Sequence, residues 1–447
     1  MPRSLIASAL ALGLVAGSAA AAEAEAAGVQ EVMAPVAVAG NLNVFATQVA
    51  YDKGTIYTVN VEPAQGVATG INLRTVVRKG TPIAGDGYRW TSSVVESRTM
   101  DDNYHTQPSI AVDKAGYIHI VYNMHNMPWQ YVVSTRPGDI TEFTFRGEPV
   151  GTTVLGLVKF KSQTPFPSLG SAAIPGNQIT YPAFFKDRNG ELYVTYRHAV
   201  RPKRPFKERE YACGIAKYNA ATQLWNPLGG KIAVSDADAE RAGTVTAFCS
   251  QSGWWGYQPR LWFDKQNHMH VSWAWRQGSA GGDCTNLSYA VSTDGGRTFK
   301  RSDGSAYSLP IKVYEGESVL PDRNTRVACR SNLSGDATGA NPMVSFQYFA
   351  KGFAATPRVR GAWAKPLGAP YGGQIVSSDE QGGLWAFASS GRVATGSSLS
   401  RVPWRLVTQS AGYCVSKVQP VPERKAFLVH TQSCDNTKVK LVWVPWS

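Results

Sequence analysis

Polar and apolar positions along the chain repeat one pattern, in which a polar turn is followed by a stretch of alternating apolar and polar residues. The second copy reads Asp-Lys-Ala-Gly-Tyr-Ile-His-Ile-Val-Tyr, and the copies begin at Asp52, Asp113, Asp187, Asp264 and Asp379. Asp and Gly favour the turn because an Asp side chain hydrogen-bonds nearby backbone and Gly tolerates positive φ. The alternation indicates a strand with two different faces. Another strand precedes the turn, as at 109–112 and 260–263, so each copy predicts a β-hairpin.

The spacing of the copies predicts how these hairpins are assembled. Successive turns are about 60 to 80 residues apart, and the wider last gap leaves room for one undetected copy. Four-stranded blades repeated around an axis leave only short, protected edges and account for a repeat of this length. The expected fold class is all-β: a β-propeller of four-stranded antiparallel blades, seven in number, with six blades or a β-sandwich as alternatives. The 43 Gly, the 26 Pro and the lack of long helical spacing agree with this prediction.

The start of the chain has the pattern of a secretory signal peptide. Met1 is followed by Pro and Arg, then by an apolar run over 5–17 and small residues to Ala22. The run is shorter than the about 20 residues that a membrane-spanning helix needs. We therefore expect a signal peptide over 1–22, an N-terminal linker over 23–40 and a single β-propeller catalytic domain over 41–447, secreted and without a membrane partner. The alternative for the first segment is a disordered Ala-rich tail.

Charge narrows the class of partner. The formal net charge is +13 although only 17% of the residues are charged. Such a field concentrates anions near the surface and speeds their capture. Nucleic acid does not suit a secreted protein, so we expect an acidic polysaccharide as the partner, bound by a monomer.

The six cysteines are compatible with three disulfides in a secreted protein. Cys414 and Cys434 flank a predicted hairpin, and we expect these two to be bonded. A structural metal ion, a zinc held by Cys213 or Cys249 and a nearby histidine, is the alternative for the earlier cysteines. A further motif, Ser-Thr-Asp-Gly-Gly-Arg-Thr-Phe over 292–299, has the Asp-box pattern, which sialidases, lectins and lyases share and which therefore indicates the propeller fold only.

Candidate chemistry gathers at the ends of the hairpins. His105 precedes the first strand of one hairpin, and His125 follows its second strand. Antiparallel pairing returns the chain to its start, so the two imidazoles should lie near one another. Tyr181 and Arg197 bracket the next hairpin in the same way. The alternative for the two histidines is a structural role, as a hydrogen-bonded pair.

The other histidines and the third hairpin complete the pattern. His119, His268 and His270 lie inside repeat strands and are expected to be structural, whereas the role of His198 stays open. Tyr257 precedes the third hairpin and Arg276 follows it. Three neighbouring blades therefore deliver polar groups to one face of the predicted propeller, near its central channel.

These residue types suit the cleavage of a 4-linked uronic acid by β-elimination. An arginine neutralises the uronate carboxylate through a bidentate, charge-assisted bond, which makes the C5 proton acidic enough to remove. A neutral histidine takes that proton, and a tyrosine hydroxyl protonates the departing O4. This chemistry requires no metal and no cofactor.

The stretches around His105, His125, Tyr181, Arg197 and Arg276 resemble the BNR-repeat polysaccharide lyases, whose best-known members are seven-bladed ulvan lyases. They read Tyr-His-Thr-Gln-Pro-Ser, Tyr-Asn-Met-His-Asn, Thr-Tyr-Pro-Ala-Phe-Phe, Tyr-Arg and Trp-Ala-Trp-Arg. The resemblance covers about residues 40–310. It implies that His105 is the base, or base and acid together, that His125 is the second active-site histidine, that Tyr181 is the catalytic tyrosine and that Arg197 is the carboxylate neutraliser.

The remaining site predictions concern substrate binding. We expect Tyr257, Arg276, Asn126, Arg201 and Arg204 to contact the polymer. The last two belong to a basic run that either lines a polyanion groove or is a solvated loop. Trp254, Trp255, Trp273 and Trp275 are candidates for stacking against sugar rings.

Several functions stay open at this point. Ulvan, in which sulfated rhamnose alternates with glucuronate or iduronate, is the expected substrate. Related propeller lyases act instead on rhamnosyl-glucuronate side chains of plant gums. A sialidase-like hydrolase or a non-catalytic glycan-binding propeller would share the fold, but a lectin has no need to assemble His105 with Tyr181 and Arg197.

Overall fold

The protein is described by a computed structural model over residues 29–39, 45–63, 73–99, 105–147, 174, 176, 178–239, 242–278, 283–349, 352–399, 404–410 and 412–446. The expected signal peptide over 1–22 lies outside these residues. The described part contains β-strands and three short 3-10 helices, Phe206–Glu208, Pro370–Gly372 and Pro422–Arg424, and no α-helix. Among the described residues, no helix has the length and apolar character needed to cross a membrane.

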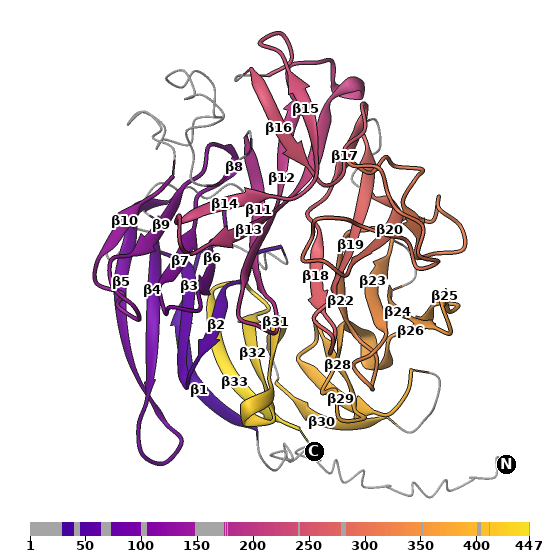
Figure 1. Ribbon diagram of the computed structural model, residues 1–447. Helices are drawn as coiled ribbons and strands as arrows, with labels where there is room; N and C mark the ends of the chain where they lie inside the picture. Colours follow the sequence, from indigo (N-terminus) through magenta and orange to yellow (C-terminus); the bar gives the residue numbers. More distant parts are fainter. Residues whose placement is uncertain are drawn as a thin grey trace, which may run out of the picture.

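The strands form antiparallel groups arranged around a common centre (Figure 1). The first groups are β2 (Val49–Asp52), β3 (Thr55–Pro63), β4 (Leu73–Pro82) and β5 (Tyr88–Thr99), then β6 (Ser109–Val112), β7 (Ile118–Val121), β9 (Tyr131–Ser134) and β10 (Phe143–Phe145). Next come β11 (Ile179–Lys186), β12 (Leu192–Arg201), β13 (Glu210–Asn219) and β14 (Leu224–Pro227), then β18 (Arg260–Phe263), β19 (Met269–Gln277), β20 (Thr285–Ser292) and β21 (Glu317–Ser318).

The later groups follow the same plan. They are β22 (Val327–Gly335), β23 (Pro342–Tyr348) and β24 (Gly352–Val359) with the short β25 (Ala362–Trp363) and β26 (Leu367–Gly368), then β27 (Gly373–Ser378), β28 (Leu384–Ala388), β29 (Arg392–Gly396) and β30 (Arg405–Gln409), and finally β31 (Tyr413–Val421), β32 (Ala426–Ser433) and β33 (Lys438–Pro445) with β1 (Gln30–Ala37). The first strand of each group lies innermost: β2 contacts β6 and β31, β6 contacts β11, and β22 contacts β18 and β27. The all-β propeller is therefore confirmed, and the expected count of seven blades stays a prediction.

Three additional features, formed by four strands, modify the plan on one side. The short β17 (Trp254–Gly256) pairs with both β13 and β19 and so joins two groups into one ten-stranded sheet. The hairpin of β15 (Gly230–Val234) and β16 (Gly243–Ala247) projects beyond the sheets, at the top of Figure 1. The short β8 (His125–Met127) leaves its own group and pairs with β11. All three lie toward the end of the molecule where the candidate residues gather.

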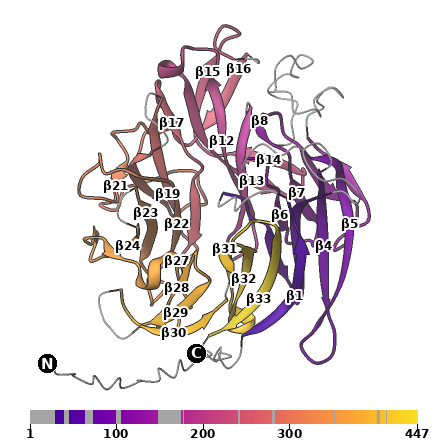
Figure 2. The same ribbon diagram turned by 180° about the vertical axis from the view of Figure 1, so that it is seen from behind.

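The ring is closed by strands from the two ends of the described chain. Figure 2 shows the indigo β1 beside the yellow β33, and the two strands pair antiparallel. The expectation that 23–40 is a linker outside the domain is therefore wrong for 30–37. This segment buries Val32 and Met33 against the C-terminal strands and covers an edge of the last sheet. Pro35 falls within the register shift between Met33 and Val36, as an edge strand tolerates.

The repeat seen in the sequence has a second physical basis beyond its turn. In three of the copies, those at Asp113, Asp264 and Asp379, the turn Asp binds the backbone with one carboxylate oxygen and the side chain six positions later with the other. In the second copy, Asp113 accepts from the Tyr117 backbone at 2.9 Å and lies 3.2 Å from Nε2 of His119. In the last copy, Asp379 accepts from Nε1 of Trp385 at 3.0 Å. The turn and the following strand are thereby fixed to each other.

Two of these contacts continue into a neighbouring strand. Nδ1 of His119 lies 2.6 Å from the Tyr131 hydroxyl, and Nδ1 of His270 lies 2.6 Å from the Tyr289 hydroxyl. Burial lowers the pKa of both imidazoles, so both are neutral near pH 7. The expectation that these histidines are structural is confirmed.

Removing one turn carboxylate should destabilise the fold. Asp264 accepts from the backbone N–H groups of Gln266 and His268 and contacts His270, and it is buried. We expect Asp264→Ala to lower the free energy of unfolding by about 2–4 kcal/mol, because it removes a partner of the buried His270 ring and two bonds that hold the turn. Asp303→Ala is the matched control, since Asp303 also caps a turn but is exposed. Urea unfolding measures both, and equal losses would contradict the prediction.

The 292–299 motif is held by local bonds. The Ser292 hydroxyl donates to Asp294 and accepts from the Gly296 backbone, each at 2.8 Å. Asp294 also accepts from the Thr298 hydroxyl at 2.6 Å. Gly296 has a φ of +90°, which a residue with a side chain rarely adopts. The turn aims Phe299 into the core, where the ring is buried.

The cysteines pair differently from the prediction. Cys213 is bonded to Cys249, and Cys284 is bonded to Cys329. The zinc alternative for Cys213 or Cys249 is therefore wrong, because neither is a thiolate. The Cys414–Cys434 bond is not formed either: the two sulfur atoms face each other at 2.8 Å, which is longer than a disulfide bond. The hairpin correctly predicted that the two cysteines are neighbours but not that they are bonded.

Candidate active site

The candidate site is organised by the exchange of β8 between two groups of strands. His125 opens β8, and it lies opposite Thr180 of β11. The Thr180 hydroxyl accepts from the Asn126 backbone at 2.9 Å and donates to the Asn126 side chain at 3.1 Å. These bonds hold the end of one hairpin against the start of the next. The Asn126 side chain, expected to bind substrate, is thus part of this junction.

The two histidines lie together, as predicted from their positions at the two ends of one hairpin. The rings of His105 and His125 are stacked with centroids 4.0 Å apart and planes 8° from parallel. The ring of His105 also lies 5.5 Å from the ring of Tyr181. Both histidines are partly exposed. The site therefore begins with an accessible pair of imidazoles beside a tyrosine ring.

Tyr181 occupies an unusual backbone position. Its φ is +58°, and the register of β11 shifts between Thr180 and Ala183. A bulge of this kind re-aims a side chain, and positive φ in a bulky residue is costly unless its surroundings impose it. The ring stacks on Phe45 at 4.2 Å and is buried. Asn123 and Asn126, near the same end of the sheets, also have positive φ. Three residues with positive φ thus lie near the histidine–tyrosine cluster, and Tyr181 is the bulky one among them.

Arg197 lies at the centre of a ring of tyrosines. Its guanidinium carbon is 4.8 Å from the ring of Tyr181, 4.9 Å from that of Tyr211 and 5.3 Å from that of Tyr257. The residue is 5% exposed, and its Nε has no hydrogen-bond partner. No ion pair joins it to a described carboxylate. Aromatic faces attract the cation but do not neutralise it, so this positive charge is available to an anionic ligand.

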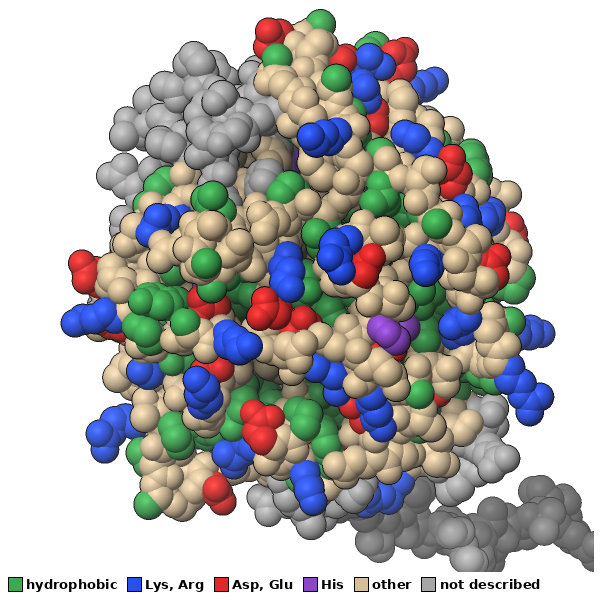
Figure 3. Space-filling view, in the orientation of Figure 1, with side chains coloured by type: hydrophobic (Ala, Val, Ile, Leu, Met, Phe, Trp, Pro, Cys, Tyr) green, Lys and Arg blue, Asp and Glu red, His purple; other side chains and the backbone are tan. Residues whose placement is uncertain are grey.

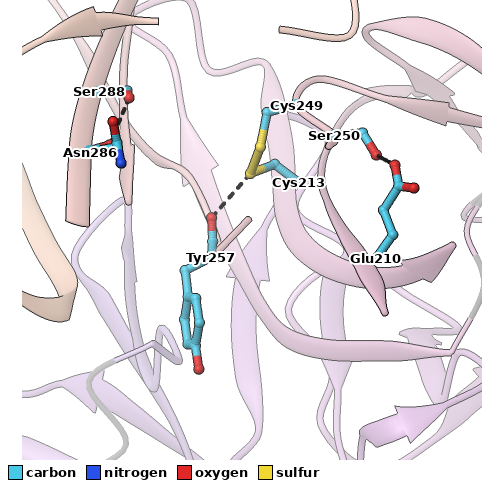
Figure 4. Close-up of a disulfide and its surroundings, with 7 residues drawn as sticks. All are labelled: Glu210, Cys213, Cys249, Ser250, Tyr257, Asn286 and Ser288. Atoms are coloured by element: carbon cyan, nitrogen blue, oxygen red, sulfur yellow. Dashed lines mark hydrogen bonds between the residues drawn. A yellow bond between two sulfur atoms is a disulfide. The ribbon is translucent and has the colours of Figure 1, made fainter. Parts of the chain in front are cut away.

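A disulfide lies next to Arg197 and Tyr257. Arg197 lies opposite Cys213 in the register of β12 and β13, and Sγ of Cys213 lies 3.2 Å from the Tyr257 carbonyl oxygen (Figure 4). Gly256 is required here, because a Cβ at that position would lie 2.7 Å from both sulfur atoms of the Cys213–Cys249 bond. The bond ties β13 to the segment at Cys249, and the Tyr257 backbone contacts the sulfur of Cys213.

The other predicted substrate-binding residues lie beside this cluster. Tyr257 is part of it, whereas Arg276 is stacked over the Trp255 ring at 4.8 Å. The two arginines of the basic run are held in ion pairs: Arg201 with Glu210 and Asp238, and Arg204 with Asp238 at 2.6 Å. These arginines fix the loop after β12 to its surroundings, and their contact with a polymer stays a prediction.

Two expectations about aromatic residues need correction. Trp273 and Trp275 are 1% and 0% exposed, so the idea that they stack on sugar rings is wrong. They belong to a core cluster, because both point to the same, inward face of β19. Trp254 and Trp255 keep part of their surface exposed.

His198, whose role was open, belongs to the interior. It is 0% exposed, and burial lowers its pKa to about 3, so the ring stays neutral. It lies next to Arg197 along a strand, and successive side chains of a strand point to opposite faces. It therefore faces away from the candidate site.

Two residues of the site, Tyr211 and Phe45, were not predicted from the ends of the hairpins. Tyr211 is the second residue of β13, which begins at the same end of the sheet where β12 ends, so the same reasoning applied to three strands instead of two would have found it. Phe45 precedes β2 and carries no motif. The described residues contain no group of three or more His, Cys, Asp and Glu side chains that could hold a metal ion. The groups of the site that can take part in a reaction are two imidazoles, several phenols and one guanidinium group.

Solved structures with the same fold include polysaccharide lyases. The crystal structure of polysaccharide lyase Uly1 matches with a TM-score of 0.62 at 13% identity, covering 92% of each chain. A PL25 ulvan lyase bound to -[GlcA(1-4)Rha3S]- matches with a TM-score of 0.57 at 12% identity, covering 92% of this chain and 93% of the lyase. At this identity the likeness concerns the fold.

Sequence comparison identifies the family. No curated protein sequence matches the chain. The model of the BNR repeat-containing family matches residues 74–367, which is more than half of the chain and includes the histidine, tyrosine and arginine cluster. The protein therefore belongs to the BNR repeat-containing family, and its structure resembles those of polysaccharide lyases.

Proposed function

We propose that this protein is a secreted, monomeric polysaccharide lyase that cleaves a 4-linked uronic acid by β-elimination and needs no cofactor. The observation that carries the proposal is the position of Arg197: a guanidinium group without a described carboxylate partner, 4.8 Å from the ring of Tyr181, which itself lies 5.5 Å from His105. A uronate carboxylate at this arginine would place its sugar ring next to a phenol and an imidazole. A lectin has no use for that combination of groups.

The proposed reaction uses each group once. Arg197 binds the carboxylate and stabilises the negative charge that develops on it. His105 takes the proton from C5, the C4–O4 bond breaks, and a double bond forms between C4 and C5. Tyr181 gives a proton to O4 of the leaving chain. His125, stacked on His105 at 4.0 Å, positions that ring.

Charge and the structural relatives support the substrate class. The similar PL25 ulvan lyase has been solved with glucuronate linked 1,4 to sulfated rhamnose bound to it. The present chain carries a net charge of +13, and Lys and Arg side chains are spread over the face shown in Figure 3. A sulfated polyuronate such as ulvan suits that surface. The alternative is the rhamnosyl-glucuronate side chain of a plant gum.

The purified protein should raise the ultraviolet absorbance of a uronate polymer as it forms the 4,5-unsaturated product. Ulvan and gum arabic are the first two polymers to compare, and we expect the increase with ulvan. An increase with gum arabic alone would assign the gum side chain instead. New reducing ends without the absorbance change would indicate a hydrolase. Binding without either signal would indicate a glycan-binding propeller, and both of these results would overturn the proposal.

A further inference from the structure

The centre of the propeller contains a cavity separate from the candidate active site. It has a volume of about 390 Å³ and is lined mainly by the first strands of the groups: β2, β6, β11, β18, β22, β27 and β31. A smaller cavity of about 20 Å³ adjoins it and shares Arg260 in its lining. The smaller cavity thus has room for about one particle of the size of a water molecule.

Lys186, which lines the larger cavity, is paired with Asp52 at 3.6 Å. Three further basic side chains converge on these cavities. Arg260 lines both, Arg330 lines the smaller one, and Lys417 lines the larger one. They come from β18, β22 and β31, so the three are close in space although they are distant in sequence. Burial, and then the charges of Arg260 and Arg330, hold the pKa of Lys417 far below its usual range. Burial and the charge of Arg330 lower the pKa of Arg260 to about 10.

No described carboxylate neutralises Arg330 or Lys417. Glu380, which lines the larger cavity, is paired with Arg188 instead. The groups around the cations are neutral: Gln347 accepts from Arg330 at 3.4 Å, and burial and the charge of Lys417 lower the pKa of His430 to about 3. Like charges gathered in a poorly hydrated site destabilise the fold unless an opposite charge joins them.

The remaining polar side chains around the smaller cavity are hydrogen-bonding groups without charge. Its lining includes Ser331, Asn332, Ser345, Gln347, Gln374 and Ser416. Amides and hydroxyls of this kind can donate to an anion without changing its charge. The site therefore combines a positive field, neutral donors and room for a particle of about the size of one water molecule.

We propose that Arg260, Arg330 and Lys417 bind a small inorganic anion of the size of chloride in the central channel. The anion supplies the negative charge that the described residues around Arg330 and Lys417 lack. Since it binds only where strands of three different groups meet, it stabilises the closed ring over the unfolded chain.

The site also lies close to the candidate active site without being part of it. Nη1 of Arg260 donates to the Phe45 carbonyl oxygen at 3.3 Å, and the Phe45 ring stacks on Tyr181 at 4.2 Å. Phe45 thus separates the channel cations from the tyrosine. This inference does not depend on the lyase proposal, because it concerns stability and the channel residues only.

The test is thermal unfolding of the full-length protein as chloride replaces a bulky organic sulfonate at constant ionic strength. We expect a melting temperature that rises with chloride and saturates, by about 2–4 °C in total. Arg330→Gln and Lys417→Met should lose this response. Lys114→Met, at a lysine whose side chain is 70% exposed, should keep it. Identical curves in the two salts, or an unchanged response in both channel variants, would overturn the proposal.

A direct measurement covers the case in which the channel variants do not fold. Crystals of the unaltered protein grown in bromide should show an anomalous peak between Arg260, Arg330 and Lys417. A peak at that place supports the proposal independently of any variant. Well-ordered side chains with no peak between them would overturn it.

Discussion

Replacing Arg197 by methionine should lower kcat/KM on the uronate polymer by about 10²–10³-fold, the loss typical of removing a group that stabilises charge in the transition state. The reason is geometric and electrostatic together. Arg197 is enclosed by the rings of Tyr181, Tyr211 and Tyr257 and forms no ion pair with a described carboxylate. Its charge is the one that the proposed reaction uses to acidify C5. Methionine keeps an unbranched chain between the rings and removes only the cation.

Two further variants separate charge from geometry. Arg197→Lys keeps the charge but cannot form a bidentate bond with a carboxylate, so it should recover only part of the activity. Arg188→Met, at an arginine that pairs with Glu380 in another part of the molecule, should leave the initial rate unchanged. Rates come from the ultraviolet assay, and circular dichroism confirms that each variant is folded. Full activity of Arg197→Met would remove the arginine from the mechanism and with it the main support for the lyase.

The repeat explains why the fold was predictable from the sequence. In three of the copies the turn Asp contacts the side chain six positions later, as Asp113 does His119 and Asp379 does Trp385. The hairpin is thus encoded twice, by its turn and by its strand pattern. The segment of β1 carries neither this turn nor this strand pattern, and it becomes a strand by pairing with β33 at the far end of the chain. A contact of that kind leaves no local signal, which is why the sequence pattern predicts a linker over 30–37.

The candidate site, like the fold, was predictable where its residues belong to the repeated hairpins. His105, His125, Tyr181 and Arg197 could be grouped because each lies at an end of a hairpin, and the structure brings them together. The tryptophans of β19 could not be placed correctly, because their exposure depends on which face of the strand they occupy. Phe45 could not be found, since its contact with Tyr181 crosses between segments far apart in the sequence.

The cysteines show the limit of local patterns in another way. Cys213 and Cys249 lie 36 residues apart and meet only because the chain returns to β13 after the β15–β16 hairpin. Spacing alone could not choose this pair among the 15 pairings that six cysteines allow. Cys414 and Cys434, which are close in a hairpin, were easier to predict as a pair and are not bonded.

The second large loss of activity is expected when His105, the proposed base, is replaced. His105→Ala should lower kcat by about 10²–10⁴-fold, the range that a positioned general base contributes. The ring lies 4.0 Å from that of His125 and 5.5 Å from that of Tyr181, and it is partly exposed, so it can meet a sugar held at Arg197. His125→Ala is the matched control: it removes an equal ring from the same stack and should cost less, because it positions the base and does not take the proton.

Tyr181→Phe allows the base and the acid to be told apart. The variant keeps the ring that stacks on Phe45 and His105 and removes only the hydroxyl, so the fold of the site should survive. If Tyr181 protonates O4, a substrate whose O4 leaving group is a stable anion, such as a nitrophenolate, needs no acid. That substrate should restore most of the rate to Tyr181→Phe but none to His105→Ala, because removal of the C5 proton is still required. Recovery in His105→Ala instead would exchange the two roles, since the group whose loss a good leaving group repairs is the acid.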